Sequence, residues 1–310
     1  MAYGDFREYL TALEKRGEVR RVRTEVDPRF EIGAICRKLF AEQGPTAIFE
    51  NVKGSDWPVV TNPFTSRSRV AFALGISEKD LLSFWVDRYK KRLPSVRVER
   101  APCKEVIREV DLEVPAMAEI VLEGRIVPFA REAEGPFGKW HGYYTGEAPR
   151  PVLEFTCMTH RKSPLYLTTY EGLPIYGPTN VLQAVAREPV WFEYIRSYSC
   201  PTIKDFHFSP GGCAGLQAVV SMSKQVEGQA KNVIADVLRS HAVKHVVVVD
   251  EDIDARDMSQ VEWAIATRVQ ADRDLIIIPG AAGLKIDPSQ PDFPTGVGAK
   301  MGIDATTQTA

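Results

Sequence analysis

The last third of the sequence alternates predicted strands with predicted helices, and this alternation limits the possible folds more than any other feature. Residues 246–249 are four consecutive valines, a run typical of a strand buried on both faces. Strands alternating with helices require crossover connections, which predicts an α/β fold with parallel strands. The predicted strands are 214–222, 246–249 and 275–278, and the predicted helices are 228–241 and 259–267. No regular element is predicted after Pro279.

The first hundred residues predict a second α/β region. Asp5 can cap a helix whose apolar residues repeat at helical spacing, and Gly17 can end it. Prolines at 94, 102 and 115 then interrupt the pattern and mark a seam between domains. Further helices are predicted at 28–40, 70–74, 77–89 and 180–192, and strands at 18–26, 46–49 and 58–61. Three β-rich stretches, 119–127, 152–160 and 165–170, predict an antiparallel or barrel-like middle segment.

Composition favours small-molecule chemistry over other function classes. The net charge of -2 over 310 residues provides no field for attracting nucleic acid. No apolar run approaches the roughly 20 residues that a membrane-spanning helix needs. The five cysteines are widely spaced without a CxxC pair, so neither a zinc site nor a disulfide framework is expected. The first residues show no secretion signal, and a cytoplasmic location is therefore expected.

Residues 134–144 read Glu-Gly-Pro-Phe-Gly-Lys-Trp-His-Gly-Tyr-Tyr and bring titratable and aromatic groups together on a turn shaped by glycine and proline. Desolvation by apolar neighbours would raise the pKa of Glu134 and prepare it to move a proton. Lys139 could grip a substrate carboxylate, Trp140 could stack on a planar ring, and His141 could donate to a reacting group. The run therefore predicts an active-site loop. The alternative is a surface loop with solvated charges and a structural histidine.

Acidic residues offer two further candidates. Asp250, Glu251, Asp252 and Asp254 follow the four valines and could bind a ligand or metal at the carboxyl end of a strand. Helix capping and loop solubility are the favoured explanation. Glu119 and Glu123 would share one face of a strand and could reach a pocket, although a polar strand face is the commoner reason. Nucleotide-binding, serine-hydrolase and zinc-protease motifs are absent from the sequence.

Several segments together resemble the UbiD family of reversible decarboxylases. The segments are 5–10, 48–54, 111–124, 134–138, 142–144, 263–268 and 300–306. The resemblance implies an N-terminal α/β region (1–110), a central split β-barrel like that of flavin reductases (111–212) and a C-terminal α/β domain (213–310) used for oligomerisation.

The resemblance also implies a chemistry. Family members use prenylated FMN with Mn²⁺ and K⁺ to release CO₂ from aromatic or α,β-unsaturated carboxylic acids. Glu134 would belong to the catalytic network, and Lys139 occupies the position of the acid that protonates the product. Trp140, His141 and His241 would line the substrate pocket, and Arg239 would contact the flavin phosphate. A homo-oligomer (dimer or hexamer) and a flavin prenyltransferase that supplies the cofactor are the implied partners.

The chain departs from the family pattern in two places. A lysine, with an ordinary pKa near ~10.4, stands where the family has a carboxylic acid. The long family segment that carries the Asn, His and Glu ligands of the metal, together with the catalytic arginine, has no counterpart before Val114-Pro115-Ala116. The central barrel is therefore expected to be truncated, and no metal ligand is assigned. The alternative function is a non-catalytic subunit or scaffold of a decarboxylase complex.

Overall fold

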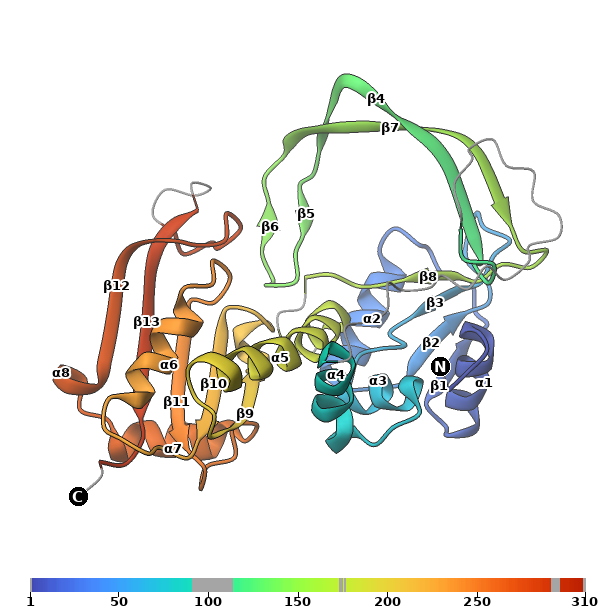
Figure 1. Cartoon of the computed structure of the whole chain (residues 1–310). Helices are drawn as coiled ribbons and strands as arrows, with labels where there is room; N and C mark the ends of the chain where they lie inside the picture. The colour runs from blue at the N-terminus through green and yellow to red at the C-terminus, as the bar shows by residue number, and fades with distance from the viewer. Residues whose placement is uncertain (1, 91–113, 173–174, 176, 291–295, 309–310) are drawn as a thin grey trace. The chain divides into compact units, whose positions relative to one another are not determined.

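The structure is a computed structural model that describes residues 2–90, 114–172, 175, 177–290 and 296–308. The chain divides into two compact units (Figure 1). The first comprises Met1–Ile76 and Leu93–Leu173, and the second comprises Ser77–Arg92 and Pro174–Ala310. No helix among the described residues is long and apolar enough to cross a bilayer.

The first unit contains a four-stranded sheet in the order β1-β2-β3-β8. Strand β2 pairs parallel with β1 and antiparallel with β3, and β8 pairs parallel with β3. Helix α2 packs on the sheet face of Phe49, and α1 packs on the opposite face of Ile48. The bounds are β1 Val19–Val22, β2 Thr46–Phe49, β3 Val59–Thr61, β8 Tyr166–Thr168, α1 Phe6–Lys15, α2 Glu31–Ala41 and α3 Arg67–Leu74.

Helix α1 begins where the sequence predicts it. The Asp5 carboxylate accepts the backbone N–H of Glu8 at 2.9 Å and so satisfies a donor that the first helical turn leaves open. Tyr9, Leu10 and Leu13 are buried on one face of the helix. The predicted amphipathic helix is confirmed.

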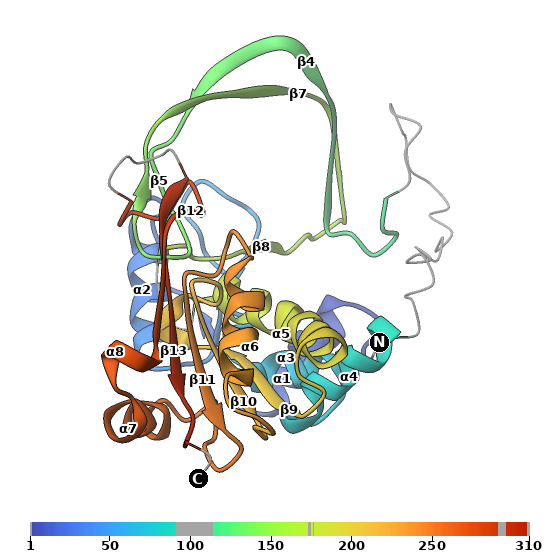
Figure 2. The same cartoon turned by 60° about the vertical axis from the view of Figure 1, so that its left-hand side comes forward.

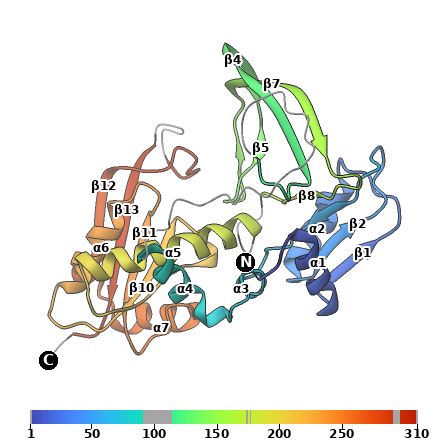
Figure 3. The same ribbon diagram turned by 45° about the vertical axis from the view of Figure 1, so that its right-hand side comes forward.

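The middle of the first unit is an open antiparallel ribbon. Strand β4 (Ile120–Glu134) pairs with β7 (Ala148–His160), and β5 (Phe137–Gly138) pairs with β6 (Tyr144–Thr145). Figures 2 and 3 show β4 and β7 running side by side. The described residues form no closed barrel, so the split barrel expected for residues 111–212 is represented by this ribbon alone.

The second unit contains a five-stranded sheet in the order β12-β13-β11-β10-β9. Helices α5 and α6 cover one face, and α7 covers the other. Helix α4 packs against α5. The bounds are β9 Ile203–Phe208, β10 Gln217–Met222, β11 His245–Asp250, β12 Leu275–Ala282, β13 Val297–Ala305, α4 Leu81–Lys90, α5 Pro178–Tyr198, α6 Gln229–Leu238, α7 Met258–Arg268 and α8 Ala271–Asp274, with 3-10 turns η1 Glu78–Asp80 and η2 Pro210–Gly212.

The predicted parallel pairing is confirmed in this sheet. Strands β10, β11 and β13 run parallel, and the four valines of β11 are buried on both faces. Strands β9 and β12 pair antiparallel at its edges. The expected domain boundary between residues 212 and 213 lies between β9 and β10, which are hydrogen-bonded neighbours of one sheet.

Strand β13 corrects the expectation of an irregular tail after Pro279. It lies inside the sheet between β11 and β12. The sequence pattern does not predict this strand, because Lys300 and Asp304 are polar yet buried, and Gly302 is a poor strand former. Gly302 is needed by packing: a Cβ at this position would lie 2.1 Å from Ile234 Cγ2 of α6.

We expect Gly302→Ala to lower the free energy of unfolding of the second unit by about 1–3 kcal/mol, because the added methyl forces α6 away from the sheet. Chemical denaturation would measure the loss. Gly211→Ala is the control, since a Cβ there meets nothing within 4 Å. Equal stability of the two variants would contradict the close packing of α6 on β13.

Candidate active site

Glu134 is the last residue of β4 and lies at the end of the ribbon. Its side chain is 55% exposed, and its carboxylate lies 3.4 Å from Nε of Arg150 on β7. The desolvation expected from its apolar sequence neighbours is therefore not found. The carboxylate is exposed to solvent and lies beside the Arg150 guanidinium. Its catalytic role stays a prediction.

Lys139 begins a tight turn between β5 and β6. Its backbone N–H donates to the carbonyl of Tyr143 at 3.0 Å, and the N–H of Gly142 donates back to the Lys139 carbonyl at 2.9 Å. The Lys139 ammonium lies 3.6 Å from the centre of the Phe137 ring, a cation–π contact. Glu134 lies beside Arg150 and Lys139 lies over Phe137, so the structure does not bring the two side chains into an ion pair.

His141 is buried beneath the same turn. Its Nδ1 accepts the backbone N–H of Tyr143 at 3.2 Å, and its ring meets the edge of Trp140 with centroids 5.4 Å apart. These contacts match the structural explanation for His141, because they fix the turn that carries Lys139. The expected role of Trp140 and His141 in a substrate pocket stays a prediction.

The two remaining expected site residues belong to the second unit. Arg239 ends α6, and its guanidinium lies 4.5 Å from the centre of the Tyr194 ring. His241 lines a small pocket together with Lys244, Asp287 and Lys300. Lys300 donates from Nζ to the Leu238 carbonyl at 2.7 Å and to the Ser240 carbonyl, so it satisfies the end of α6. Burial lowers the pKa of this lysine. Lys244 pairs with Asp287 at 2.9 Å, so both lysines of this pocket already bind groups of the protein.

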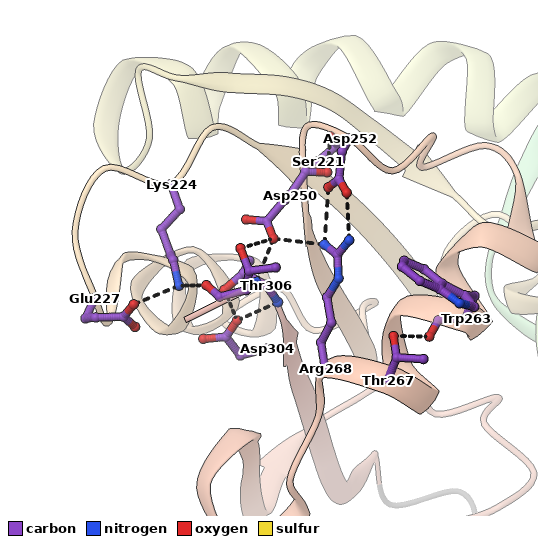
Figure 4. Close-up of polar contacts among 11 residues, drawn as sticks. Ser221, Lys224, Glu227, Asp250, Asp252, Trp263, Thr267, Arg268, Asp304 and Thr306 are labelled. Carbon is purple, nitrogen blue, oxygen red and sulfur yellow. Dashed lines mark hydrogen bonds and ion pairs between the residues drawn. The ribbon is translucent and has the colours of Figure 1, made fainter. Parts of the chain in front are cut away.

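The acidic residues after β11 are held by protein donors. Figure 4 shows Arg268 of α7 reaching Asp250 and Asp252, at 2.9 Å and 2.6 Å. The hydrogen bond from Arg268 lowers the pKa of Asp252. Asp250 also accepts the N–H of Thr307 at 2.6 Å, which ties the end of the chain to β11. This arrangement supports the structural explanation of the acidic run.

Glu119 is also held by protein donors. It accepts two hydrogen bonds from Arg7 at 2.9 and 2.7 Å and one from the N–H of Leu165 at 3.0 Å. Burial opposes its ionisation, but these donors hold its pKa below the usual range. Glu119 therefore links α1 to the base of the ribbon, and Glu123 lies buried within β4.

One buried charged cluster in the second unit could not be predicted from sequence patterns. Glu188 of α5 is fully buried and lies 2.9 Å from Nδ1 of His207, 3.2 Å from the N–H of Phe208 and 3.4 Å from the Arg256 guanidinium. Arg256 also pairs with Asp205 at 2.7 Å. These residues are distant in the sequence and share no motif spacing. The local sequence shows only that Glu188 stands directly before the proline inside α5, which does not indicate a buried cluster.

Models of three domains match the chain in order. The N-terminal domain of 3-octaprenyl-4-hydroxybenzoate carboxy-lyase matches residues 10–89, its Rift-related domain matches 96–174, and its C-terminal domain matches 180–305. The chain therefore belongs to the UbiD family, and the resemblance seen in the sequence motifs is confirmed.

Three relatives illustrate the similarity. Anhydromevalonate phosphate decarboxylase of Methanothermobacter thermautotrophicus is 43% identical over 202 residues, which are 65% of this chain and 46% of that protein, so the match spans about half of the relative's length.

The UbiD-class enzyme HmfF from Pelotomaculum thermopropionicum in complex with FMN has a TM-score of 0.86 at 31% identity, covering 97% of this chain and 94% of that one. An evolved dimeric form of HmfF was solved with prFMN, at TM-score 0.84, 28% identity and 99% and 96% coverage. Vanillic acid decarboxylase from Sedimentibacter hydroxybenzoicus, in an open form, has a TM-score of 0.87 at 25% identity, with 99% and 93% coverage.

The described residues do not fit the complete cofactor that the family implies. No group of three or more His, Cys, Asp or Glu side chains in the described part of the chain could hold a metal ion. Glu134 is paired with Arg150, and Arg239 lies on Tyr194. A metal-dependent step therefore cannot be assigned to residues of this chain, and the roles considered below are limited to proton transfer and carboxylate binding.

We expect Arg268→Gln to lower the free energy of unfolding by about 1–2 kcal/mol at pH 7, because one carboxylate partner is largely buried and the other is exposed and screened. The pKa of Asp252 is depressed from its ordinary 3.8, so the pair stabilises the fold above that value and loses its effect as pH falls through the lower folded pKa. The free energy of unfolding of the variant should therefore be lower than that of the wild type at pH 7. The two values should become equal near the pH at which acid unfolds the protein.

Denaturation curves between pH 7 and the acid transition would measure this difference. Lys204→Gln is the matched control, because the pair of Lys204 with Glu251 is half exposed on both sides and should contribute little. A loss for Arg268→Gln that stays constant down to the acid transition would contradict the assignment.

Proposed function

We propose that the chain is a UbiD-type carboxy-lyase that reversibly decarboxylates an aromatic or α,β-unsaturated carboxylic acid and depends on prenylated FMN. The observation that carries the proposal is the match of all three family domains in order, with the Glu-Gly-Pro-Phe-Gly sequence kept where β4 meets β5. The structures of HmfF with FMN and prFMN support the choice of flavin. We place the reaction in the cytoplasm, with a flavin prenyltransferase supplying the cofactor to a homo-oligomer.

Residues of the ribbon end would act on protons and on the substrate carboxylate. Glu134 can accept or release a proton once the solvent around it is displaced, since a carboxylate changes its proton affinity with its surroundings. Lys139 stands at the position of the acid that protonates the product, where it could deliver a proton or hold the substrate carboxylate. Trp140 offers an aromatic face beside this charge. For His241 we propose a contact with the substrate, and for Arg239 a contact with the flavin phosphate.

The names of the relatives suggest which acids to try first. One relative is named for vanillic acid and another for anhydromevalonate phosphate. Vanillate and a phosphorylated α,β-unsaturated acid are therefore suitable probes of the two substrate types.

A second candidate function is a non-catalytic subunit of a decarboxylase complex. Three observations favour it: Glu134 is exposed and paired with Arg150, a lysine stands at the acid position, and the described residues hold no metal-binding cluster. Such a subunit would keep the family fold without turning over substrate by itself.

Co-expression with a flavin prenyltransferase, followed by anaerobic purification with Mn²⁺ and K⁺, separates the two candidates. A flavin absorbance spectrum together with CO₂ release from either probe supports the carboxy-lyase. Colourless protein that releases no CO₂ contradicts it and supports the non-catalytic subunit.

We expect Glu134→Gln to lower the rate of CO₂ release at least ~100-fold, because the amide cannot exchange a proton while its shape is nearly the same. Steady-state rates of the flavin-loaded protein would measure the loss. Glu132→Gln is the matched control, since Glu132 is exposed two residues earlier on β4 and lies opposite Arg150. Equal rates for the two variants would remove Glu134 from the mechanism.

We expect Lys139→Glu to raise turnover about 10-fold or more if proton delivery limits the rate, because it restores an acid whose ordinary pKa is near ~4.3 rather than ~10.4. Lys139→Gln removes the charge without adding an acid and should show no gain. A fall in turnover for both variants would instead show that the lysine charge itself is needed to bind the substrate carboxylate.

A further inference from the structure

The ribbon of β4 and β7 exposes a row of large apolar side chains. Each member of the row exposes between 50% and 67% of its surface, although each lies within a regular strand. We call this set the ribbon patch. Its members are Leu122, Ile126, Leu153, Phe155 and Met158.

Strand register places the whole patch on one face. Leu122 lies opposite Met158, and Ile126 lies opposite Leu153. Directly opposed residues of an antiparallel pair point to the same face, and residues two apart on one strand share a face. A β-bulge lies between the pairs Glu123–Cys157 and Gly124–Phe155 and leaves one extra residue on β7. Phe155 and Met158 therefore lie on the same face. The patch is therefore continuous along the ribbon.

The opposite face mixes polar and apolar side chains, since Val121 lies opposite Thr159 and the charged Glu123 is buried. Arg125 lies opposite Glu154, and their side chains form an ion pair at 2.8 Å. Glu123 and Cys157 form the next opposed pair on this face. The two faces of the ribbon therefore differ, because the row of exposed large apolar side chains lies on the patch face. A two-stranded sheet is marginally stable by itself, so such an apolar face requires a cover.

The size of the patch is what a symmetric interface needs. With on the order of 100 Å² exposed by each large apolar side chain, the patch offers roughly 500 Å², which exceeds the scattered apolar surface of an ordinary monomer. Two such patches packed together would bury about 1,000 Å², which reaches the lower range of specific interfaces.

We propose that a second copy of this chain covers the ribbon patch, with the two ribbons packed face to face about a two-fold axis. A two-fold interface brings each patch against itself, so it requires a surface without uncompensated charge. The ribbon patch meets this requirement, since all of its members are uncharged. The product is a four-stranded, two-layer sandwich with its mixed faces outward. The proposal concerns this surface alone and does not rest on the catalytic proposal.

Packing of this kind would also act on the candidate site. Glu134 lies on the same strand as Leu122 and Ile126, so an ordered ribbon would hold the end of β4 in one position. The dimer would therefore stiffen the strand that carries Glu134 whether or not the chain is catalytic.

Sedimentation velocity between 1 and 100 μM tests the proposal with the double variant Leu153→Glu/Phe155→Glu. Two charges per copy at the centre of a symmetric interface should raise the dissociation constant of one association step at least 100-fold. Phe30→Glu is the matched control, because Phe30 is an 81% exposed phenylalanine of the same unit outside the ribbon. A wild type that stays monomeric at 100 μM, or equal mass distributions for wild type and double variant, would overturn the proposal.

A cross-link then locates the contact, even if other surfaces of the chain also associate. Benzoylphenylalanine at position 155 of unlabelled chain is mixed with ¹⁵N-labelled chain, irradiated and digested. We expect intermolecular adducts with peptides of β4 or β7. Adducts confined to other elements, or an absence of intermolecular adducts, would overturn the face-to-face arrangement. Circular dichroism at a concentration where the wild type is monomeric should show the same melting temperature for all variants within about 2 °C, because the substituted residues are then exposed in every variant.

Discussion

The pairing of β4 with β7 is the constraint on which the functional part of the molecule depends. These two strands are hydrogen-bonded only to each other within the described residues, and the Glu134 to Tyr144 run extends from their end. The same pairing sets which side chains share a face, so it creates both the face of Arg125 and Glu154 and the ribbon patch. The candidate site and the candidate interface are thus two consequences of one strand register.

The second unit depends on a different principle. Its parallel strands bury valines on both faces, and several of its charged groups pair within the unit. Lys300 donates a hydrogen bond to the last turn of α6, and Arg268 forms ion pairs with Asp250 and Asp252. The Glu188 carboxylate lies within hydrogen-bonding distance of His207 and Arg256. Buried charges of this kind are tolerated because each one has hydrogen-bonding partners. Internal packing and ion pairs therefore stabilise this unit, whereas the ribbon of the first unit exposes a row of apolar side chains on one face.

Sequence periodicity predicted the regular parts of the fold well. The helix at α1, the valine strand β11 and the parallel pairing of β10 with β11 followed from local pattern, because apolar spacing reports burial directly. Strand β13 could not be predicted in this way, because polar residues such as Lys300 and Asp304 are typical of a surface segment although here they are buried. The chemical groups of the 134–144 run could be predicted from the sequence, but their surroundings could not. Whether a carboxylate such as Glu134 is desolvated depends on chain segments brought near it by tertiary packing, and here Arg150 and solvent surround it.

We propose that this chain breaks and re-forms the carbon–carbon bond that joins the carboxyl group of its substrate to the conjugated system, with a proton replacing the CO₂ that leaves. The most direct measurement is isotope exchange: flavin-loaded protein is incubated with ¹³C-bicarbonate and either vanillate or a phosphorylated α,β-unsaturated acid, and the carboxyl carbon of the recovered acid is analysed by mass spectrometry. A reversible carboxy-lyase is predicted to place ¹³C in the carboxyl group of one of these acids, at a rate proportional to protein concentration. Label no higher than that of heat-inactivated protein, in a preparation that carries the flavin, would contradict the claim.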